Sequence, residues 1–167
     1  MGKASGVALI GFMGAGKSTV GRLLAEQLQL AFVDLDRLIE ARAATDIPSL
    51  FGTEGEEGFR AREAAALAEV LAGEGLVLAC GGGTPCQPES MASLVRWGRT
   101  VFLDVTLAVL RQRVTGEGRP LWDEDTESRL AQRQPFYRRA DLTVDGDRVP
   151  EEVVKGIVAG LQTMERK

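Results

Sequence analysis

The sequence of 167 residues contains no histidine and only two cysteines, which narrows the chemistry open to the chain. A general base must be a carboxylate, because the side chain that ordinarily titrates near neutral pH is missing. A structural zinc site needs four cysteine or histidine ligands, which Cys80 and Cys86 cannot supply. We interpret both as reduced, non-catalytic thiols, as is typical of a cytoplasmic protein.

Long apolar runs and excess positive charge are also missing. No apolar run approaches the ~20 residues of a membrane span, so no membrane partner is expected. The net charge of −4 and the pI near 5.0 disfavour nucleic-acid binding, which calls for a basic face. With 44% hydrophobic residues, the chain is long enough to bury one core, and we expect a single monomeric domain over residues 1–167.

Lysine is scarce as well, because only four of the 20 basic residues are lysines and three of these lie near the ends of the chain. The fourth, Lys17, lies in the stretch 11–19, which fits the phosphate-binding pattern G-x-x-x-x-G-K-[ST]. The apolar run 7–10 before it suits a buried strand, and the residues after it form a helical pattern. A strand, a glycine turn and a helix N-terminus together create an anion site, since backbone N–H groups and the helix dipole point at the phosphates.

The residues expected to bind the phosphates of a nucleotide in this loop are Gly14, Ala15, Gly16, Lys17, Ser18 and Thr19. The glycines let the main chain curl closely around the ligand, and Lys17 reaches the β- and γ-phosphates. The Ser18 hydroxyl is a candidate ligand for Mg²⁺. The alternative is a glycine turn without a ligand, which the flanking strand and helix disfavour.

Short apolar runs alternate with helical patterns along the whole chain. The expected strands are 7–10, 31–33, 76–79, 100–103 and 142–144, and the expected helices are about 17–29, 36–44, 55–72, 88–97, 106–114, 124–139 and 150–164. This alternation predicts a three-layer α/β/α fold with a five-stranded parallel sheet. Residues 116–122 escape the alternation, and we interpret them as a mobile loop.

Two further clusters follow predicted strands, where ligands of parallel sheets gather. Asp34 and Asp36 end the second strand, and they share a face if the strand continues through them. A Mg²⁺ shell and a substrate hydroxyl would stabilise such a carboxylate pair, whereas the alternative makes one of the two, Asp36 rather than Asp34, merely the N-cap of a helix starting near Arg37. The triplet 81–83 is all glycine, which indicates close approach of a ligand to the backbone, or else a tight turn into Thr84.

In the order of the chain, the motifs are GxxGxGKST, FVDLD, GEEGFRARE at 55–63, GGG, RPL at 119–121 and RQPFY at 133–137. This combination resembles the shikimate kinase family, and the similarity runs from about residue 7 to 161. The resemblance implies the P-loop, nucleoside-monophosphate-kinase-like fold with a mobile lid. It also implies ATP-dependent phosphorylation of the 3-hydroxyl of shikimate, a small cyclic carboxylate, as a step of aromatic amino-acid biosynthesis.

For the substrate shikimate, the resemblance implies a binding region at about 34–63 and four contacts. Asp36 would hold the hydroxyls and serve as the catalytic base, or only orient the attacking hydroxyl. Arg60 and Arg133 would clamp the carboxylate, and Gly82 would lend a backbone donor. From the residues alone, the favoured interpretation of Arg60 is a solvated arginine that pairs with Glu63 one turn away, and the resemblance reverses it.

For the nucleotide, the resemblance implies a lid at about 115–123 that carries Arg119 to the transferring phosphate. Arg119 would thus be both a catalytic and an ATP-binding residue, alongside Lys17. Asp34 would order the Mg²⁺ shell beside Ser18, and Arg148 would lie near the adenine. Two alternatives stay open: another small-molecule kinase of this fold, such as a gluconate kinase, and a nucleotide-binding relative that has lost catalysis.

Overall fold

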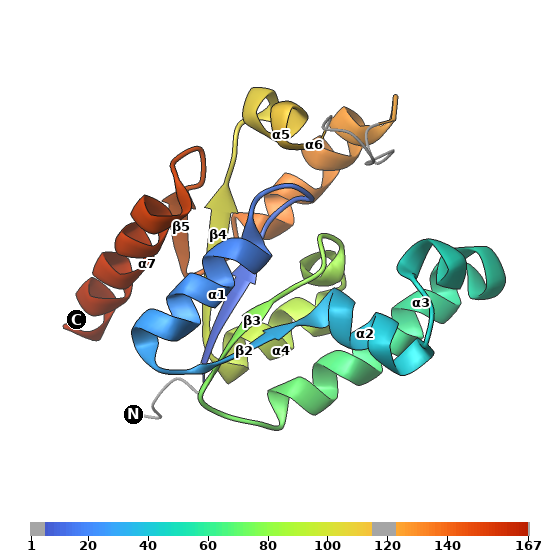
Figure 1. Ribbon diagram of the computed structural model, residues 1–167, viewed down its shortest axis with the longest axis horizontal. Helices are drawn as coiled ribbons and strands as arrows, with labels where there is room; N and C mark the ends of the chain where they lie inside the picture. The colour runs from blue at the N-terminus through green and yellow to red at the C-terminus, as the bar shows by residue number, and fades with distance from the viewer. Residues whose placement is uncertain (1–5, 115–122, 167) are drawn as a thin grey trace.

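The computed structural model describes residues 6–114 and 123–166, and its centre is a parallel sheet of five strands (Figure 1). The strands are β1 (Gly6–Ile10), β2 (Ala31–Asp34), β3 (Leu76–Ala79), β4 (Arg99–Asp104) and β5 (Leu142–Asp145), in the spatial order β2-β3-β1-β4-β5. Every pairing is parallel, so the carboxyl ends of all five strands lie along one edge. The chain order reverses on either side of β1, which is where ligands bind in such sheets. All five predicted strands are confirmed to within one residue at each end.

Helices cover both faces of the sheet and complete three layers. They are α1 (Lys17–Leu28), α2 (Leu35–Ala43), α3 (Ile47–Leu71), α4 (Pro88–Trp97), α5 (Leu107–Val114), α6 (Thr126–Tyr137) and α7 (Pro150–Glu165), with a short 3₁₀ turn η1 (Thr84–Cys86). Helix α1 packs beside α7, and α3 packs beside α4 (Figure 1). The predicted fold class is therefore confirmed.

Helix α3 differs from the prediction, because it begins at Ile47 and not near residue 55. Asp46 caps it by accepting a hydrogen bond from the Ser49 backbone N–H over 2.8 Å, and Pro48 stands in its first turn. Gly55, with φ 69° and ψ −175°, breaks the helical geometry inside it. The sequence pattern revealed only the segment after this break, although Asp46 with Pro48 two residues later is a good helix start.

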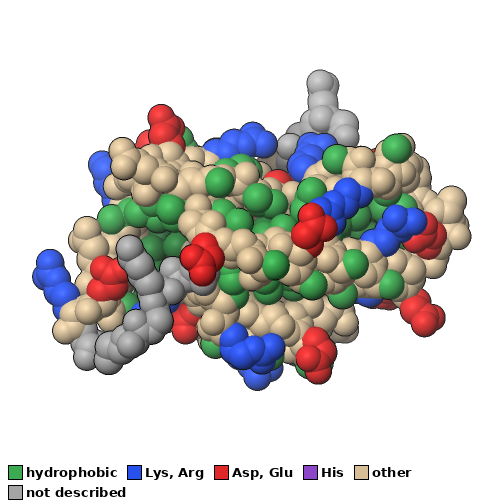
Figure 2. Space-filling model, turned by 90° about the horizontal axis from the view of Figure 1, so that it is seen from below, with side chains coloured by type: hydrophobic (Ala, Val, Ile, Leu, Met, Phe, Trp, Pro, Cys, Tyr) green, Lys and Arg blue, Asp and Glu red, His purple; other side chains and the backbone are tan. Residues whose placement is uncertain are grey.

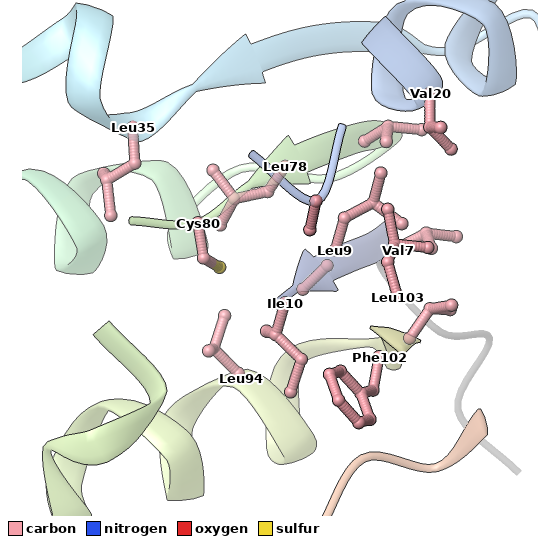
Figure 3. Packing of buried hydrophobic residues seen from close by; sticks show 14 of the residues in the cluster. Val7, Leu9, Ile10, Val20, Leu35, Leu78, Cys80, Leu94, Phe102 and Leu103 are labelled. Atoms are coloured by element: carbon pink, nitrogen blue, oxygen red, sulfur yellow. The ribbon is translucent and has the colours of Figure 1, made fainter. Parts of the chain in front are cut away.

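The core lies against both faces of the central strands. Strand β1 is buried along its whole length, as expected for the middle of a parallel sheet. Figure 3 shows Val20 of α1 on one side of these strands and Leu94 of α4 on the other. The core thus holds β1 and β3 rigidly beneath the loops that leave their carboxyl ends.

The surface carries charges of both signs. On the face in Figure 2, apolar side chains run across the middle, and acidic and basic side chains lie around them. Among the described residues, no helix is long and apolar enough to cross a membrane.

Candidate active site

The loop between β1 and α1, residues 11–16, makes a tight turn at the carboxyl end of the central strand. Gly14 and Gly16 have φ values of 76° and 90°, a conformation that side-chain-bearing residues rarely adopt. A Cβ atom at Gly14 would stand 2.6 Å from Cγ2 of Val114, so packing also demands glycine there. Gly16 is the N-cap of α1, and the positive end of this helix therefore opens into the loop.

Lys17 is the first residue of α1, and its side chain turns back across the loop. The Nζ atom donates hydrogen bonds to the carbonyl oxygens of Gly11 at 2.8 Å and Phe12 at 2.9 Å. Burial lowers the pKa of Lys17, while Asp36 and Asp34 act in the opposite direction. Both acidic residues of the predicted site therefore lie within electrostatic reach of the ammonium group.

Asp34 ends β2 and directly faces Ser18. The Ser18 hydroxyl donates to Oδ2 of Asp34 over 2.5 Å, and Oδ1 of Asp34 accepts from the Arg37 backbone N–H at 3.2 Å. The N-cap of α2 is therefore Asp34, the less favoured of the two acids considered for the cap, and not Asp36. The strand also does not continue through both acids. Helix geometry, rather than strand alternation, directs Asp36.

Asp36 lies in the first turn of α2 and is largely withdrawn from water. Burial raises the pKa of Asp36 to about 6, and the nearby Lys17 ammonium partly opposes this rise. Asp34 and Glu63 contribute in the raising direction, because like charges disfavour ionisation. The carboxylate is therefore poised close to the range in which it can accept a proton at neutral pH.

The glycine triplet brings the predicted substrate residues together. A Cβ at Gly81 would stand 2.8 Å from Oδ1 of Asp36, and a Cβ at Gly82 would stand 3.3 Å from Nη1 of Arg133. A Cβ at Gly83 would stand 2.5 Å from Nη2 of Arg60. Asp36, Arg60 and Arg133 come from three separate helices, and each lies against one of the three glycines. The triplet thus provides the room in which these charged groups converge.

Arg60 both pairs with Glu63 and faces the glycine turn. Its Nη1 donates to Oε2 of Glu63 over 2.7 Å, while the Arg60 side chain is 19% exposed and that of Glu63 is 2% exposed. The ion pair considered from the sequence is therefore present, but it is buried rather than solvated. Glu63 is a residue whose importance the sequence did not reveal, because spacing alone cannot separate a buried ion pair from an exposed one.

Arg133 projects from α6 toward the phosphate loop. Its guanidinium carbon lies 5.8 Å from the centre of the Phe12 ring. Its positive charge also contributes to lowering the pKa of Lys17, after burial, the largest cause. One turn later, the fully buried Tyr137 donates its hydroxyl to the Gly82 carbonyl over 2.6 Å. The R-x-P-x-Y motif therefore fixes the glycine turn with its tyrosine and presents the arginine beside it.

Two arginines near the expected nucleotide site, Arg148 and Arg113, have different surroundings. Arg148 is exposed and pairs with Asp145 at 3.0 Å and with Glu152 at 3.9 Å. Arg113 of α5, which the sequence reading left out, donates to the Gly146 carbonyl at 2.9 Å and to the Ala15 carbonyl at 3.3 Å. It therefore joins the phosphate loop to the loop after β5.

Several predictions on the lid cannot be compared with the structure. Arg119, and the part of the predicted lid over 115–122, lie outside the described residues.

The parallel α/β fold, the phosphate loop and the facing cluster of arginines and aspartates define a P-loop phosphotransferase that acts on a small anionic acceptor. The chain belongs to the shikimate kinase family, since the family model described as shikimate kinase matches residues 13–162. A curated shikimate kinase from Thioalkalivibrio sulfidiphilus is 46% identical over 155 residues, which cover 89% of this chain and 82% of that protein. The resemblance predicted from the sequence is confirmed.

Solved structures agree with this assignment. A shikimate kinase from Acinetobacter baumannii, solved in complex with shikimate, is 36% identical with a TM-score of 0.90, and the match covers 98% of this chain and 96% of that one. A gluconokinase from Sinorhizobium meliloti is only 20% identical, with a TM-score of 0.63 and coverage of 98% and 95%. The second likeness shows a shared fold alone.

Proposed function

We propose that the chain transfers the γ-phosphoryl group of ATP to the 3-hydroxyl of shikimate, which yields shikimate 3-phosphate and ADP. Membership of the shikimate kinase family supports the reaction. The observation that carries the proposal for the site is the convergence of Asp36, Arg60 and Arg133 on the glycine triplet beside Lys17. This arrangement suits an acceptor with a carboxylate at one end and hydroxyls at the other.

The substrate carboxylate would lie between Arg60 and Arg133. Guanidinium forks match the two oxygens of a carboxylate, and a compact anion would replace the repulsion between the two cations with attraction. The Gly82 N–H would add a backbone donor, and the contact of Tyr137 with the Gly82 carbonyl holds the next peptide of the turn in place. The hydroxyls would then extend toward Asp36, whose raised pKa suits an acceptor of the hydroxyl proton.

The nucleotide would occupy the phosphate loop, with Gly14 to Thr19 around its phosphates. Lys17 would exchange its loop carbonyls for the β- and γ-phosphates and neutralise charge as the phosphoryl group moves. Arg113 donates to the Ala15 carbonyl of this loop and to the Gly146 carbonyl after β5, and we add it to the residues proposed to flank ATP. Arg119 and Arg148 stay proposals from the family resemblance.

Mg²⁺ fits the pair formed by Ser18 and Asp34. Magnesium bound with a nucleotide is usually held by one or two protein groups, with phosphates and water completing the octahedron. A hydroxyl and a carboxylate that already touch over 2.5 Å supply such a pair, and the described residues form no cluster of three or more acidic, cysteine or histidine ligands. When bound, the ion would neutralise charge on the phosphates.

The remaining parts of the proposal concern the whole chain. We propose one domain over residues 1–167, a lid at about 115–123 and a substrate-binding region at about 34–63. Cys80 and Cys86 are both free thiols, which supports a reducing compartment such as the cytoplasm. We propose a monomer as the simplest assembly.

A coupled assay of ADP release tests the proposed function. The purified chain would be supplied with ATP, Mg²⁺ and one acceptor at a time: shikimate, gluconate or a nucleoside monophosphate. Turnover with shikimate alone supports the proposal. Turnover with gluconate or a nucleotide instead would identify another kinase of this fold, and ATP binding without any turnover would identify a catalytically silent relative.

Replacing either arginine of the proposed clamp should weaken shikimate binding and spare ATP. Arg60→Ala and Arg133→Ala each remove a charge-assisted pair, so shikimate affinity should fall by roughly 30-fold or more, equivalent to a few kcal/mol. Titration calorimetry with each ligand separately measures this. Arg62→Ala is a matched control, because Arg62 pairs on the exposed surface with Glu54. A loss of ATP affinity with normal shikimate affinity would place these arginines on the wrong ligand.

Asp34→Asn should raise the Mg²⁺ concentration needed for half-maximal activity. The substitution removes the ligand charge but keeps the cap of α2, because asparagine caps helices as well as aspartate does. Initial rates measured against Mg²⁺ should shift by about tenfold and recover at saturating metal. An unchanged Mg²⁺ dependence would exclude Asp34 from the metal shell.

A further inference from the structure

Thr84 and Glu63 form a buried polar contact beside the glycine triplet. Thr84 is completely buried, Glu63 is 2% exposed, and the Thr84 hydroxyl donates to Oε1 of Glu63 over 2.6 Å. Burying a carboxylate is costly unless its oxygens are hydrogen-bonded, so this contact holds Glu63 in one orientation. The chemistry described above makes no use of Thr84.

The other oxygen of Glu63 holds Arg60. Oε2 accepts from Nη1 of Arg60 over 2.7 Å, so the two carboxylate oxygens join η1 to α3. The Nε atom of Arg60 is buried and finds no hydrogen-bond partner among the described residues. Its ion pair with the exposed Glu56 is longer, at 3.7 Å. The direction of the guanidinium therefore depends strongly on Glu63.

Thr84 is itself fixed by the glycine turn. Its backbone N–H donates to the Gly81 carbonyl at 3.2 Å, and its own carbonyl accepts from the Gln87 N–H at 3.2 Å. A Cβ at Gly81 would stand 3.0 Å from Oγ1 of Thr84 and 3.1 Å from Oε1 of Glu63. The hydroxyl thus sits directly behind the turn that presents Gly82 and Gly83 to the site.

We infer that Thr84 is a positioning residue for the substrate carboxylate: its hydroxyl orients Glu63, and Glu63 in turn aims Arg60. These contacts fix the distance between the Gly82 N–H and the Arg60 guanidinium, the two groups proposed to bind the substrate carboxylate. The inference rests on the proposed function, because it assigns Arg60 to the carboxylate of shikimate.

Thr84→Val tests the inference, since valine has nearly the shape of threonine and lacks the hydroxyl. A methyl carbon needs about 3.3 Å or more from a carboxylate oxygen, so Glu63 would be displaced and lose its donor. The KM for shikimate should rise about tenfold, because a hydrogen bond to a charged group is lost from the clamp. The kcat should stay within about threefold, and the KM for ATP should not change, because the reacting atoms and the phosphate loop are untouched.

Two further variants separate positioning from general stability. Thr84→Ser keeps the hydroxyl and should restore the KM for shikimate to within about twofold of the wild type. Thr100→Val is a matched control, because Thr100 is also completely buried and donates to a carboxylate, that of Asp141, over 2.8 Å. Thr100 lies at the amino end of β4, away from the site at the carboxyl ends of the strands. Thr100→Val should therefore lower the melting temperature and leave the KM for shikimate unchanged.

The measured KM values distinguish a failure of this inference from a failure of the proposed function. A normal KM for shikimate in Thr84→Val, or an equal rise in Thr84→Ser or Thr100→Val, would overturn the inference while wild-type turnover still supports the proposed function. If Thr84→Val does not fold, Thr84→Ala answers the same question, because it removes the hydroxyl without adding a methyl group against Glu63. A wild-type chain that does not phosphorylate shikimate would overturn the proposed function and this inference together.

Discussion

Lys17→Ala should abolish phosphoryl transfer and leave the fold intact, with turnover reduced by about 10³-fold or more. The Lys17 ammonium neutralises charge that grows only as the γ-phosphoryl group moves, so its removal acts mainly on the transition state. Alanine is also the best helix former, and position 17 begins α1, so the helix should persist. Coupled ADP release gives the rate, and circular dichroism with a thermal scan checks the fold.

A matched control makes this result specific to the phosphate loop. Lys155 lies exposed on α7, and Lys155→Ala removes the same charge far from the site, so its turnover should equal that of the wild type. Lys17→Arg keeps the charge but replaces a compact ammonium with a planar fork, and it should recover little activity. Near-normal turnover in a folded Lys17→Ala variant would contradict the proposed kinase mechanism.

The sequence predicted the framework of this protein because its signals are local. A glycine-rich loop between an apolar run and a helix leaves few alternatives for Gly16, Lys17 and Ser18, and alternating runs of β-branched and helix-forming residues define a parallel sheet. The strand ends then place Asp34 and the glycine triplet on one edge. These features depend on neighbours along the chain, which a sequence shows directly.

Features that depend on packing could not be predicted in the same way. The spacing of Arg60 and Glu63 is the same whether the pair is solvated or buried, and only the fold reveals that Thr84, 21 residues further on, satisfies the second oxygen of Glu63. Arg113 is one of two basic residues in the last turn of α5, and only its contacts with the Ala15 and Gly146 carbonyls distinguish it. The identity of the α2 cap, Asp34 rather than Asp36, could not be predicted either, because a shift of one residue in the strand end decides it.

Asp36→Asn should reduce kcat by about 10²-fold or more, because asparagine is nearly isosteric but cannot accept a proton. The pH dependence of the wild type should report the same group. The pKa of Asp36 is raised to about 6, so the base form predominates above that pH, and kcat/KM for shikimate should fall as the pH drops through about 6. The residual activity of Asp36→Asn should lack this step. A full pH profile of kcat/KM for shikimate for both proteins, at saturating Mg²⁺ and ATP, measures it.

Stability should change in the opposite direction to activity. A carboxyl whose pKa is raised by folding stabilises the folded state while it is protonated, and that contribution is lost as the pH rises through about 6. At pH 8 the ionised, largely buried Asp36 therefore destabilises the protein, and Asp36→Asn should melt at a higher temperature than the wild type. The difference should shrink as the pH approaches 4. A variant that is more stable yet nearly inactive would show that burial of Asp36 serves the chemistry. Rescue of its kcat by excess Mg²⁺, with no rescue of Asp34→Asn, would instead mean that the two carboxylates have the reverse roles.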